Sequence, residues 1–329
     1  MNLKKAHSCS ARHSAGAALL AAMLTVTLVA TFASAALWQQ FRSIEVETAE
    51  RGRVQSGWLL IGALDWARLI LREDARAGGA DYLSEPWAVP LKEARLSSFL
   101  AVDKNAINTE QESEAFLSGQ VSDLQARLNV ANLITGTTLS EPGMVSFGRL
   151  FELLGLPAQQ LTLLSNQLLL ASQAKGQTAS PLAPLMPQRV DQLAWLGVSP
   201  QVLATLAPFI TLLPQPTSVN LNTASAEVIY ACTPGLDLST AQKVVAAREQ
   251  SHFKSLADAN LQIKGPTAQF DQLRHSVGSQ FFEVLGSLRL DQTTVQERSV
   301  LQREGVVVRT LSRERGVVAD LPAATVARP

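Results

Sequence analysis

The apolar residues of the chain are concentrated first in one uninterrupted run near the N-terminus. Residues 17–37 carry no charged side chain and consist of apolar and small residues with a few threonines and one serine. As a helix, this run would extend about 31 Å, which is enough to cross the hydrocarbon core of a bilayer. The pattern therefore predicts a membrane-spanning helix.

The charges before the run predict how it is oriented across the membrane. Lys4, Lys5 and Arg12 precede it, and residues 1–16 contain no aspartate or glutamate. Because positive charges favour the cytoplasmic side of a membrane, we expect a single-pass protein with a cytoplasmic N-terminus. Everything after about Phe41 should then lie on the far side of the membrane.

A second apolar pattern follows the run and has helical spacing. Its apolar positions are Leu60, Leu64, Ala67, Ile70 and Leu71. We expect residues 17–41 and 42–77 to form the membrane half and the outer half of one long helix. This helix should end near Arg76, because two glycines, Gly78 and Gly79, follow.

Strand-like stretches occur in two parts of the chain that are far apart in sequence. They cover residues 95–100 and 114–121 in the first part, and residues 280–290, 293–303 and 306–312 in the second. Since one antiparallel sheet can draw on both parts, we expect residues 78–142 and 279–315 to form a discontinuous sheet domain. The predicted fold class is α+β: a long N-terminal transmembrane helix, an antiparallel sheet, and a large all-α domain, residues 143–278, inserted into the sheet domain. Residues 316–329 should form a loose tail.

Gly16 stands where the basic leader meets the apolar run, and three kinds of N-terminal segment fit this pattern. A secretory signal peptide would be cut after the A-x-A motif at residues 33–35, leaving a chain that starts at Ala36. An uncleaved anchor would keep the whole segment. In the third alternative only residues 1–16 are removed, because the junction resembles the site of type IV prepilins and pseudopilins where prepilin peptidase cuts after a glycine. We favour cleavage between Gly16 and Ala17, since glycine can leave a helix without a Cβ penalty.

A characteristic acid is missing just after this junction. Most pilin-like chains carry a glutamate five residues after the cut, and here that position is Ala21. A carboxylate in a bilayer is costly unless a partner neutralises it, and in a growing filament the partner is the N-terminal amine of a neighbouring subunit. A subunit with no neighbour ahead of it gains nothing from the acid. Ala21 therefore indicates the first subunit of a filament, at its tip.

Six segments, taken in order, resemble one protein family. They are WARLILRED (66–74), LSEPWA (83–88), SDLQARLNVANL (122–133), SVNLNTASAEVI (218–229), FFEVLGSLRL (281–290) and LQREG (301–305). They resemble the minor pseudopilin K family of the type II secretion system, also called general secretion pathway protein K. The resemblance covers nearly the whole chain, from Gly16 to about Arg315.

The resemblance implies a structure and a setting. It implies a long N-terminal helix, a pilin-like antiparallel sheet and a large helical domain inserted into it. It also implies a non-enzymatic subunit of the bacterial inner membrane, with its bulk in the periplasm. Its partners would be minor pseudopilins I and J and the major pseudopilin filament, in a machine that exports folded proteins across the outer membrane.

Part of the insertion is typical of a helix-hairpin-helix unit. In residues 219–249, Asn222 or Thr223 should cap a helix that begins near Ala224, and Ser239 or Thr240 should cap the next helix after a turn at Pro234-Gly235. Such units can bind nucleic-acid phosphate at backbone amides. The alternative function is therefore a periplasmic nucleic-acid-binding protein with a conventional signal peptide.

Two features of this segment speak against that alternative. Asp237 occupies the place where a phosphate-binding turn usually has a second glycine. From Val219 to Gln262, four acidic residues outnumber three basic ones, and the 28 lysines and arginines of the chain equal its 28 aspartates and glutamates. Because a nucleic-acid backbone is held by a field of positive charge, we expect no nucleic-acid partner.

The remaining residue types offer little for catalysis. We expect no catalytic residues and no metal site, because the chain has two cysteines and four histidines and shows no paired acids or nucleophile motif. Members of the resembled family often carry an acidic stretch suited to calcium, but residues 168–185 contain no acid here. Calcium is thus possible from the resemblance alone, and we expect no cofactor. We interpret His252, His275 and Cys232 as structural residues.

Overall fold

The structure is a computed structural model that describes residues 14–96, 115–173, 183–263, 268–290 and 293–316. The chain divides into two compact units, Met1–Trp58 and Leu59–Pro329. Helix α1 (Ser14–Ala77) begins in the first unit and ends in the second.

In the first unit, α1 leaves its side chains exposed from residue 16 to residue 51. The hydroxyls within the apolar run are satisfied inside the helix, because Thr25, Thr27 and Thr31 each donate to the main-chain carbonyl three residues earlier at 2.8–3.0 Å. Internal bonding of this kind is what a hydrocarbon environment requires. Among the described residues, α1 is the one helix long and apolar enough to cross a membrane.

In the second unit, α1 ends just before two glycines with positive φ angles. Gly78 has a φ of 68° and Gly79 a φ of 118°, values that residues with a Cβ rarely adopt. The Gly78 amide donates to the Asp74 carbonyl at 3.0 Å and so satisfies part of the helix end. The predicted end near Arg76 is correct to within one residue. A short 3-10 helix, η1 (Pro86–Ala88), follows.

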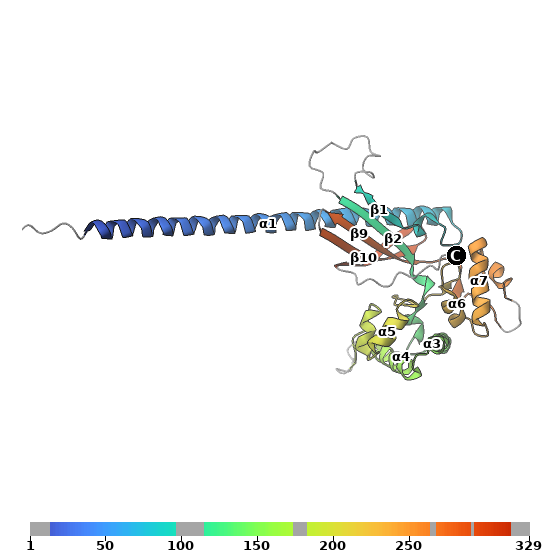
Figure 1. The fold of residues 1–329 in the computed structure, drawn as a ribbon. Coiled ribbons are helices and arrows are strands. Elements are labelled where there is room, and N and C mark those ends of the chain that lie inside the picture. Colours follow the sequence, from blue (N-terminus) through green and yellow to red (C-terminus); the bar gives the residue numbers. More distant parts are fainter. Residues whose placement is uncertain (1–13, 97–114, 174–182, 264–267, 291–292, 317–329) are drawn as a thin grey trace, which may run out of the picture. The chain divides into compact units, whose positions relative to one another are not determined.

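Five strands form one antiparallel sheet from two distant parts of the chain (Figure 1). In sequence order these are β1 (Leu91–Arg95), β2 (Ala115–Asp123), β9 (Phe281–Leu290), β10 (Thr293–Glu304) and β11 (Val307–Gly316). In space the order is β1-β2-β9-β10-β11. Strand β9 therefore lies between β2 and β10, with Phe282 opposite Asp123 on one side and Leu301 on the other.

The part of α1 in the second unit packs on one face of this sheet. Its buried positions Leu60, Leu64, Ala67 and Leu71 are among those predicted from the helical spacing. They contact buried side chains of the strands, which are Leu117, Phe282, Val284, Leu288, Leu301 and Val308. Trp87 of η1 adds an edge-on contact to Phe282, with ring centroids 5.2 Å apart.

The first predicted strand is misplaced. Strand β1 starts directly after Pro90 and ends at Arg95, the residue at which the predicted strand was expected to begin. Of the predicted stretch 95–100, residues 97–100 lie outside the described residues. The other four predicted strands agree with β2, β9, β10 and β11 to within a few residues, apart from the longer C-terminal end of β11.

The chain between β2 and β9, residues 124–280, is here called the helical insertion. Its longer helices are α3 (Glu141–Leu153), α4 (Ala158–Gln173) and α7 (Leu238–Gln250). Shorter helices are α5 (Pro200–Leu206), α6 (Ala226–Cys232) and α8 (Leu256–Asn260), with 3-10 turns η2 (Leu124–Ala126), η3 (Val130–Leu133) and η4 (Asp191–Leu196). One apolar core, which includes Phe147, Leu164, Leu206 and Ile229, holds them together.

Three pairs of two-residue strands also lie in the helical insertion, and the sequence did not predict them. They are β3 (Leu128–Asn129) with β6 (Ile210–Thr211), β4 (Ile134–Thr135) with β5 (Thr138–Leu139), and β7 (Val219–Asn220) with β8 (His275–Ser276). The predicted fold class is confirmed: a long N-terminal helix, an antiparallel sheet and a mainly helical segment between its strands. The domain boundaries at residues 142/143 and 278/279 stay predictions.

Candidate functional site

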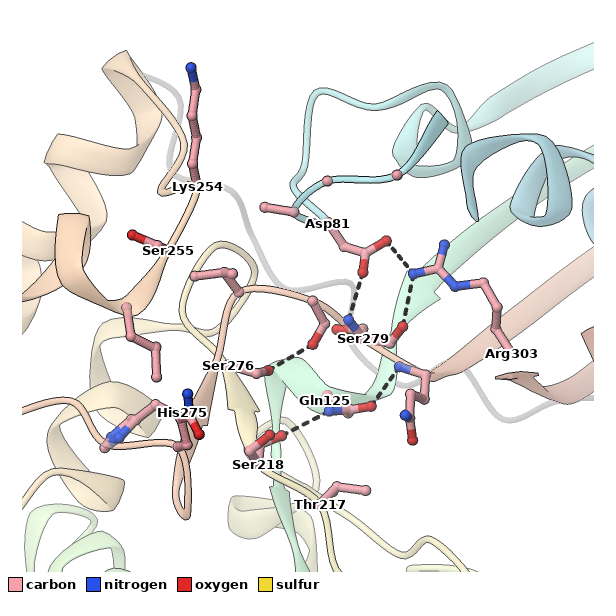
Figure 2. Close-up of a pocket in the computed structure, with 18 of the residues that line it drawn as sticks. Asp81, Gln125, Thr217, Ser218, Lys254, Ser255, His275, Ser276, Ser279 and Arg303 are labelled. Atoms are coloured by element: carbon pink, nitrogen blue, oxygen red, sulfur yellow. Dashed lines mark hydrogen bonds and ion pairs between the residues drawn. The ribbon is translucent and has the colours of Figure 1, made fainter. Parts of the chain in front are cut away.

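Polar side chains gather where the helical insertion leaves the sheet and returns to it. We call this group the neck and define it as Asp81, Asp123, Gln125, Asn220, Thr223, Ser279 and Arg303. Figure 2 shows Asp81, Gln125, Ser279 and Arg303 converging from separate segments of the chain. Among the described residues, no buried side-chain nitrogen or oxygen of the neck or elsewhere lacks a hydrogen-bond partner.

Arg303 of β10 is the cation of the neck. One of its terminal nitrogens lies 2.6 Å from Asp74 Oδ2 in the last turn of α1, and the other lies 2.5 Å from Asp81 Oδ1. The second nitrogen also donates to the Ser279 carbonyl at 2.8 Å. The guanidinium carbon lies 4.8 Å from the centre of the Phe282 ring, which covers it from the core side. The cation stands near the C-terminal end of α1, where positive charge is favourable.

Asp123 is the acceptor at the centre of the neck. Its Oδ2 accepts hydrogen bonds from Ser279 Oγ at 2.6 Å, from Thr223 Oγ1 at 2.5 Å and from Asn220 Nδ2 at 3.2 Å. Its Oδ1 accepts from the Gln125 amide at 2.7 Å. Burial raises the pKa of this carboxyl, the hydrogen bonds from Ser279, Thr223 and Gln125 oppose part of the rise, and the Asp81 charge adds to it.

A third set of bonds ties the neck to the backbone on either side. The Ser279 amide donates to Asp81 Oδ2 at 2.6 Å, and Asn220 Nδ2 donates to the Asp81 carbonyl at 3.1 Å. Gln125 accepts from the Gln280 amide at 2.7 Å and donates to the Ser218 carbonyl at 3.0 Å. Burial raises the pKa of the Asp81 carboxyl, although the Arg303 guanidinium beside it favours the charged form.

A cavity of about 980 Å³ opens beside the neck (Figure 2). Gly78 and Gly79 at the end of α1 line one part of it, and Lys254 and Ser255 at the start of α8 line another. Asp81, Gln125, Ser279 and Arg303 of the neck also line the cavity.

A cluster of three carboxylates near the neck does not fit a calcium ion. Asp74, Asp81 and Glu85 each offer an oxygen, and these atoms lie within 4.8 Å of one another. Arg303 already binds two of them, and calcium needs about six to eight oxygen ligands. Glu85 accepts from the Tyr82 amide at 3.0 Å and from Trp87 Nε1 at 2.7 Å, and burial raises its pKa to about 7. The cluster is an ion-pair group, and the expected absence of a metal stays a prediction.

The helix-hairpin-helix prediction is correct in outline and wrong in its caps. Helix α6 begins at Ala226 and is capped by Ser225, so neither Asn222 nor Thr223 caps it. Both of those side chains are buried instead: Thr223 binds Asp123, and Asn222 bonds to the backbone of Phe253.

The second helix of this unit has an acidic cap. Asp237, and neither Ser239 nor Thr240, caps α7, and its carboxylate accepts from Ser239 Oγ, the Thr240 amide and Thr240 Oγ1 at 2.6–2.9 Å. These bonds lower its pKa to about 2. Gly235 supplies the turn with a φ of 80°. A carboxylate thus occupies the helix N-terminus that a nucleic-acid phosphate would need.

The residues predicted for processing lie at the start of α1. Gly16, Ala17 and Ala21 are exposed within its first turns, and no heavy atom lies within 4 Å of the Cβ that an alanine at position 16 would carry. Nothing in the structure tests cleavage at this site, so it stays a prediction. The site lies far from the neck in sequence.

His275, His252 and Cys232 each contact other residues of the fold, and their interpretation as structural residues stays a prediction. His275 Nε2 lies 2.9 Å from Thr233 Oγ1, and burial lowers the pKa of its imidazole to about 4. His252 stacks on Tyr82 with ring centroids 3.8 Å apart. Cys232 is buried, which raises the pKa of its thiol to about 12.

Sequence reasoning missed the neck, because its members are distributed over more than half of the chain. A signal was nevertheless present. Asp123, Asn220 and Arg303 lie in three of the six segments that resemble the pseudopilin K family, and Asp74, which binds Arg303, lies in a fourth. Polar residues inside those segments were candidates for shared buried contacts.

Comparisons of the sequence with known proteins find similarity to one family. Two family models described as "Type II secretion system (T2SS), protein K" match residues 126–215 and 219–278. The chain is 24% identical to the type II secretion system protein K of Pseudomonas aeruginosa, in an alignment of 330 positions that covers 92% of this chain and 92% of the relative.

The fold has a solved counterpart. It matches a chain of the GspK-GspI-GspJ complex from the type 2 secretion system of enterotoxigenic Escherichia coli, with a TM-score of 0.60 and 17% identity. The match covers 82% of this chain and 98% of the other. Together with the apolar helix and the antiparallel sheet, these matches support a pseudopilin role, and the chain is similar to type II secretion system protein K.

Proposed function

We propose that this pseudopilin is cut between Gly16 and Ala17 by prepilin peptidase and keeps the apolar part of α1 in the bacterial inner membrane. Its N-terminus faces the cytoplasm and its bulk lies in the periplasm. It occupies the tip of a short pseudopilus, with minor pseudopilins I and J as partners above the major pseudopilin filament. There it supports the export of folded proteins across the outer membrane and catalyses no reaction itself.

One observation carries this proposal. A single helix of 64 residues, α1, is apolar and exposed in its first part, and its last part packs on the sheet. A helix of this kind suits a subunit whose first half packs with other helices in the membrane while the second supports a headgroup. A protein released by signal peptidase after residue 35 would discard that apolar part.

The tip position rests on the N-terminal residues. Ala21 leaves the subunit without the acid that would neutralise the amine of a neighbour, as expected where no subunit lies ahead. Small side chains at Ala22, Ala30 and Ala33 let other helices approach closely. The helical insertion adds bulk that would prevent another subunit from stacking above.

The partners follow from the structural match. The matched chain belongs to a complex of GspK with GspI and GspJ, and the match covers 98% of it. We assign the same partners to this chain, through the outer half of α1 and the edge of the sheet. The nucleic-acid alternative has less support, because Asp237 fills the anion position at the start of α7.

The maturation test uses the mass of the native N-terminus. The full chain, produced with prepilin peptidase, should begin at Ala17, and Gly16→Val should block the cut. Ala35→Val, which would disturb only the A-x-A motif, is the matched control and should leave the mature mass unchanged apart from the substitution. A mature chain that starts at Ala36 would support the nucleic-acid alternative and contradict the pseudopilin proposal.

The partner test is independent of processing. Membranes that contain the tagged chain together with minor pseudopilins I and J are solubilised, and the chain is purified by its tag. Both partners should co-purify, and the major pseudopilin alone, offered as control, should be retained less. Failure to retain I and J from membranes in which all three proteins are present would remove the tip assignment.

A further inference from the structure

The apolar cores on the two sides of the neck are separate. The large cluster of the helical insertion contains only residues between Leu128 and Val277. The clusters of α1 and the sheet draw on α1, η1 and the strands with their flanking residues, and on none from the helical insertion. Among the described residues, one small cluster contains members of both: Leu124 and Leu213 with Phe281 and Val300. Little apolar packing is thus available to fix the angle between insertion and sheet.

In the neck, hydrogen bonds join the helical insertion to the sheet. Ser279 Oγ donates to Asp123 Oδ2, which joins the segment that leaves the sheet to the segment that returns. Asn220 Nδ2 reaches Ser279 Oγ at 2.9 Å and so adds a strand of the insertion to the same centre. Hydrogen bonds depend on direction, whereas apolar contacts do not, so this set can define one orientation.

Arg303 connects this centre to the long helix. Its two terminal nitrogens contact three separate segments: the last turn of α1 at Asp74, the following loop at Asp81, and the returning chain at Ser279. Asp81 in turn accepts from the Ser279 amide, and its own amide donates to the Val277 carbonyl at 2.9 Å. A planar guanidinium with a fixed fork of donors holds such partners in one geometry.

We propose that Arg303 locks the orientation of the helical insertion relative to the sheet and the end of α1. With the arginine in place, the two parts move as one body. Without it, the insertion swings about its two chain connections at residues 123–125 and 279–280. This role does not depend on the proposed position in a pseudopilus.

The test measures a distance across the neck in the full chain. Thr294 on β10 and Gln159 on α4 are exposed, so spin labels at Thr294→Cys and Gln159→Cys report on the sheet and on the insertion. Cys9→Ser removes the leader thiol, and the buried Cys232 stays unlabelled. Pulsed electron–electron double resonance should give one narrow distance distribution between the two labels in the chain with Arg303. In Arg303→Met, this single narrow peak should be lost.

Arg313→Met is the matched control. Arg313 also binds a buried carboxylate, Glu297, but both residues lie within the sheet on β11 and β10. Arg315 also binds Glu297, at 3.0 Å, so the carboxylate should keep one cation after the substitution. Arg313→Met should therefore keep the narrow distance, even if it lowers the melting temperature.

The outcomes separate a lock from a merely stabilising contact. If Arg303→Met keeps the narrow distance while its melting temperature falls, the proposal is overturned. Should Arg303→Met fail to fold, Arg303→Lys and Asp81→Asn take its place, because each keeps part of the contact set. A broadened distance in these two variants supports the lock, and an unchanged one overturns it.

Discussion

The hydroxyl of Ser279 lies 2.6 Å from Asp123 Oδ2, so the residue that ends β2 is bonded to the residue that leads back into β9. These residues are 156 positions apart in the sequence. Their contact closes the helical insertion at its base. The whole insertion is consequently attached to the sheet as a loop whose two ends are tied together.

Asp123→Asn tests how much this tie contributes. Asparagine keeps one side-chain oxygen, but its nitrogen cannot accept. Either the donors at Oδ2 (Ser279, Thr223 and Asn220) or the Gln125 backbone amide at Oδ1 therefore lose their acceptor. We expect a loss of about 3 kcal/mol in the free energy of unfolding, measured with a chemical denaturant.

An exposed acid serves as the control for that measurement. Asp191 pairs with Arg189 at the surface, and Asp191→Asn should change the free energy of unfolding by less than about 1 kcal/mol. If Asp123→Asn were equally harmless, the hydrogen bonds at the base of the insertion would not contribute to stability.

The elements that depend on a regular pattern could be predicted from the sequence. The apolar run, the helical spacing from Leu60 to Leu71 and the two glycines that follow specify α1, because each acts over a few neighbouring residues. Strands β2, β9 and β10 follow for the same reason. The sequence-based prediction misplaced strand β1, because buried and exposed positions alternate only weakly along it. The strand begins directly after Pro90.

Long-range polar contacts could not be predicted in this way. Thr223 fits an N-cap by its type, but in the structure its hydroxyl binds Asp123, 100 residues away. Ser225 takes the cap instead. Local rules also favoured Ser239 or Thr240 over Asp237 for α7, although all are capping residue types. The folded neighbours, which sequence pattern does not reveal, decide between such alternatives.

His275 should make stability depend on pH. Burial lowers the pKa of its imidazole from 6.5 to about 4, the Asp271 charge opposes this shift, and the Arg274 charge adds to it. The unfolded chain binds a proton near pH 6.5 while the folded chain does not. Stability is therefore full above that pH and falls as the pH drops toward 4, by up to about 3 kcal/mol.

Thermal unfolding between pH 7 and pH 4 measures this dependence. His275→Gln should flatten the curve in that window. Ile229→Val lies at the same site, where the Ile229 carbonyl accepts from Thr233, and it should lower stability equally at every pH, by about 1 kcal/mol. An unchanged slope in His275→Gln would mean that other groups carry the pH dependence.

The thiol of Cys232 should be unreactive in the folded chain. Burial raises the pKa of its thiol to about 12, so almost no thiolate is present at neutral pH, and the residue is 2% exposed. In the chain with Cys9→Ser, a thiol reagent should react only after denaturant is added. Gln159→Cys, an exposed position, should react at once and confirm that the reagent is active. Rapid modification of Cys232 without denaturant would mean that the core of the insertion opens readily.

Two glycines of α3 should respond in opposite directions to the same substitution. A Cβ at Gly143 would lie 2.1 Å from the Asn132 carbonyl oxygen, whereas a Cβ at Gly148 meets no atom within 4 Å. Asn132 cannot move aside freely, because its side chain holds Thr217 through two hydrogen bonds of 2.8 and 3.0 Å. We expect Gly143→Ala to cost about 3 kcal/mol of stability and Gly148→Ala to add about 1 kcal/mol through helix propensity. Denaturant unfolding of both variants checks this, and equal effects at the two positions would show that η3 and α3 are not in contact at Gly143.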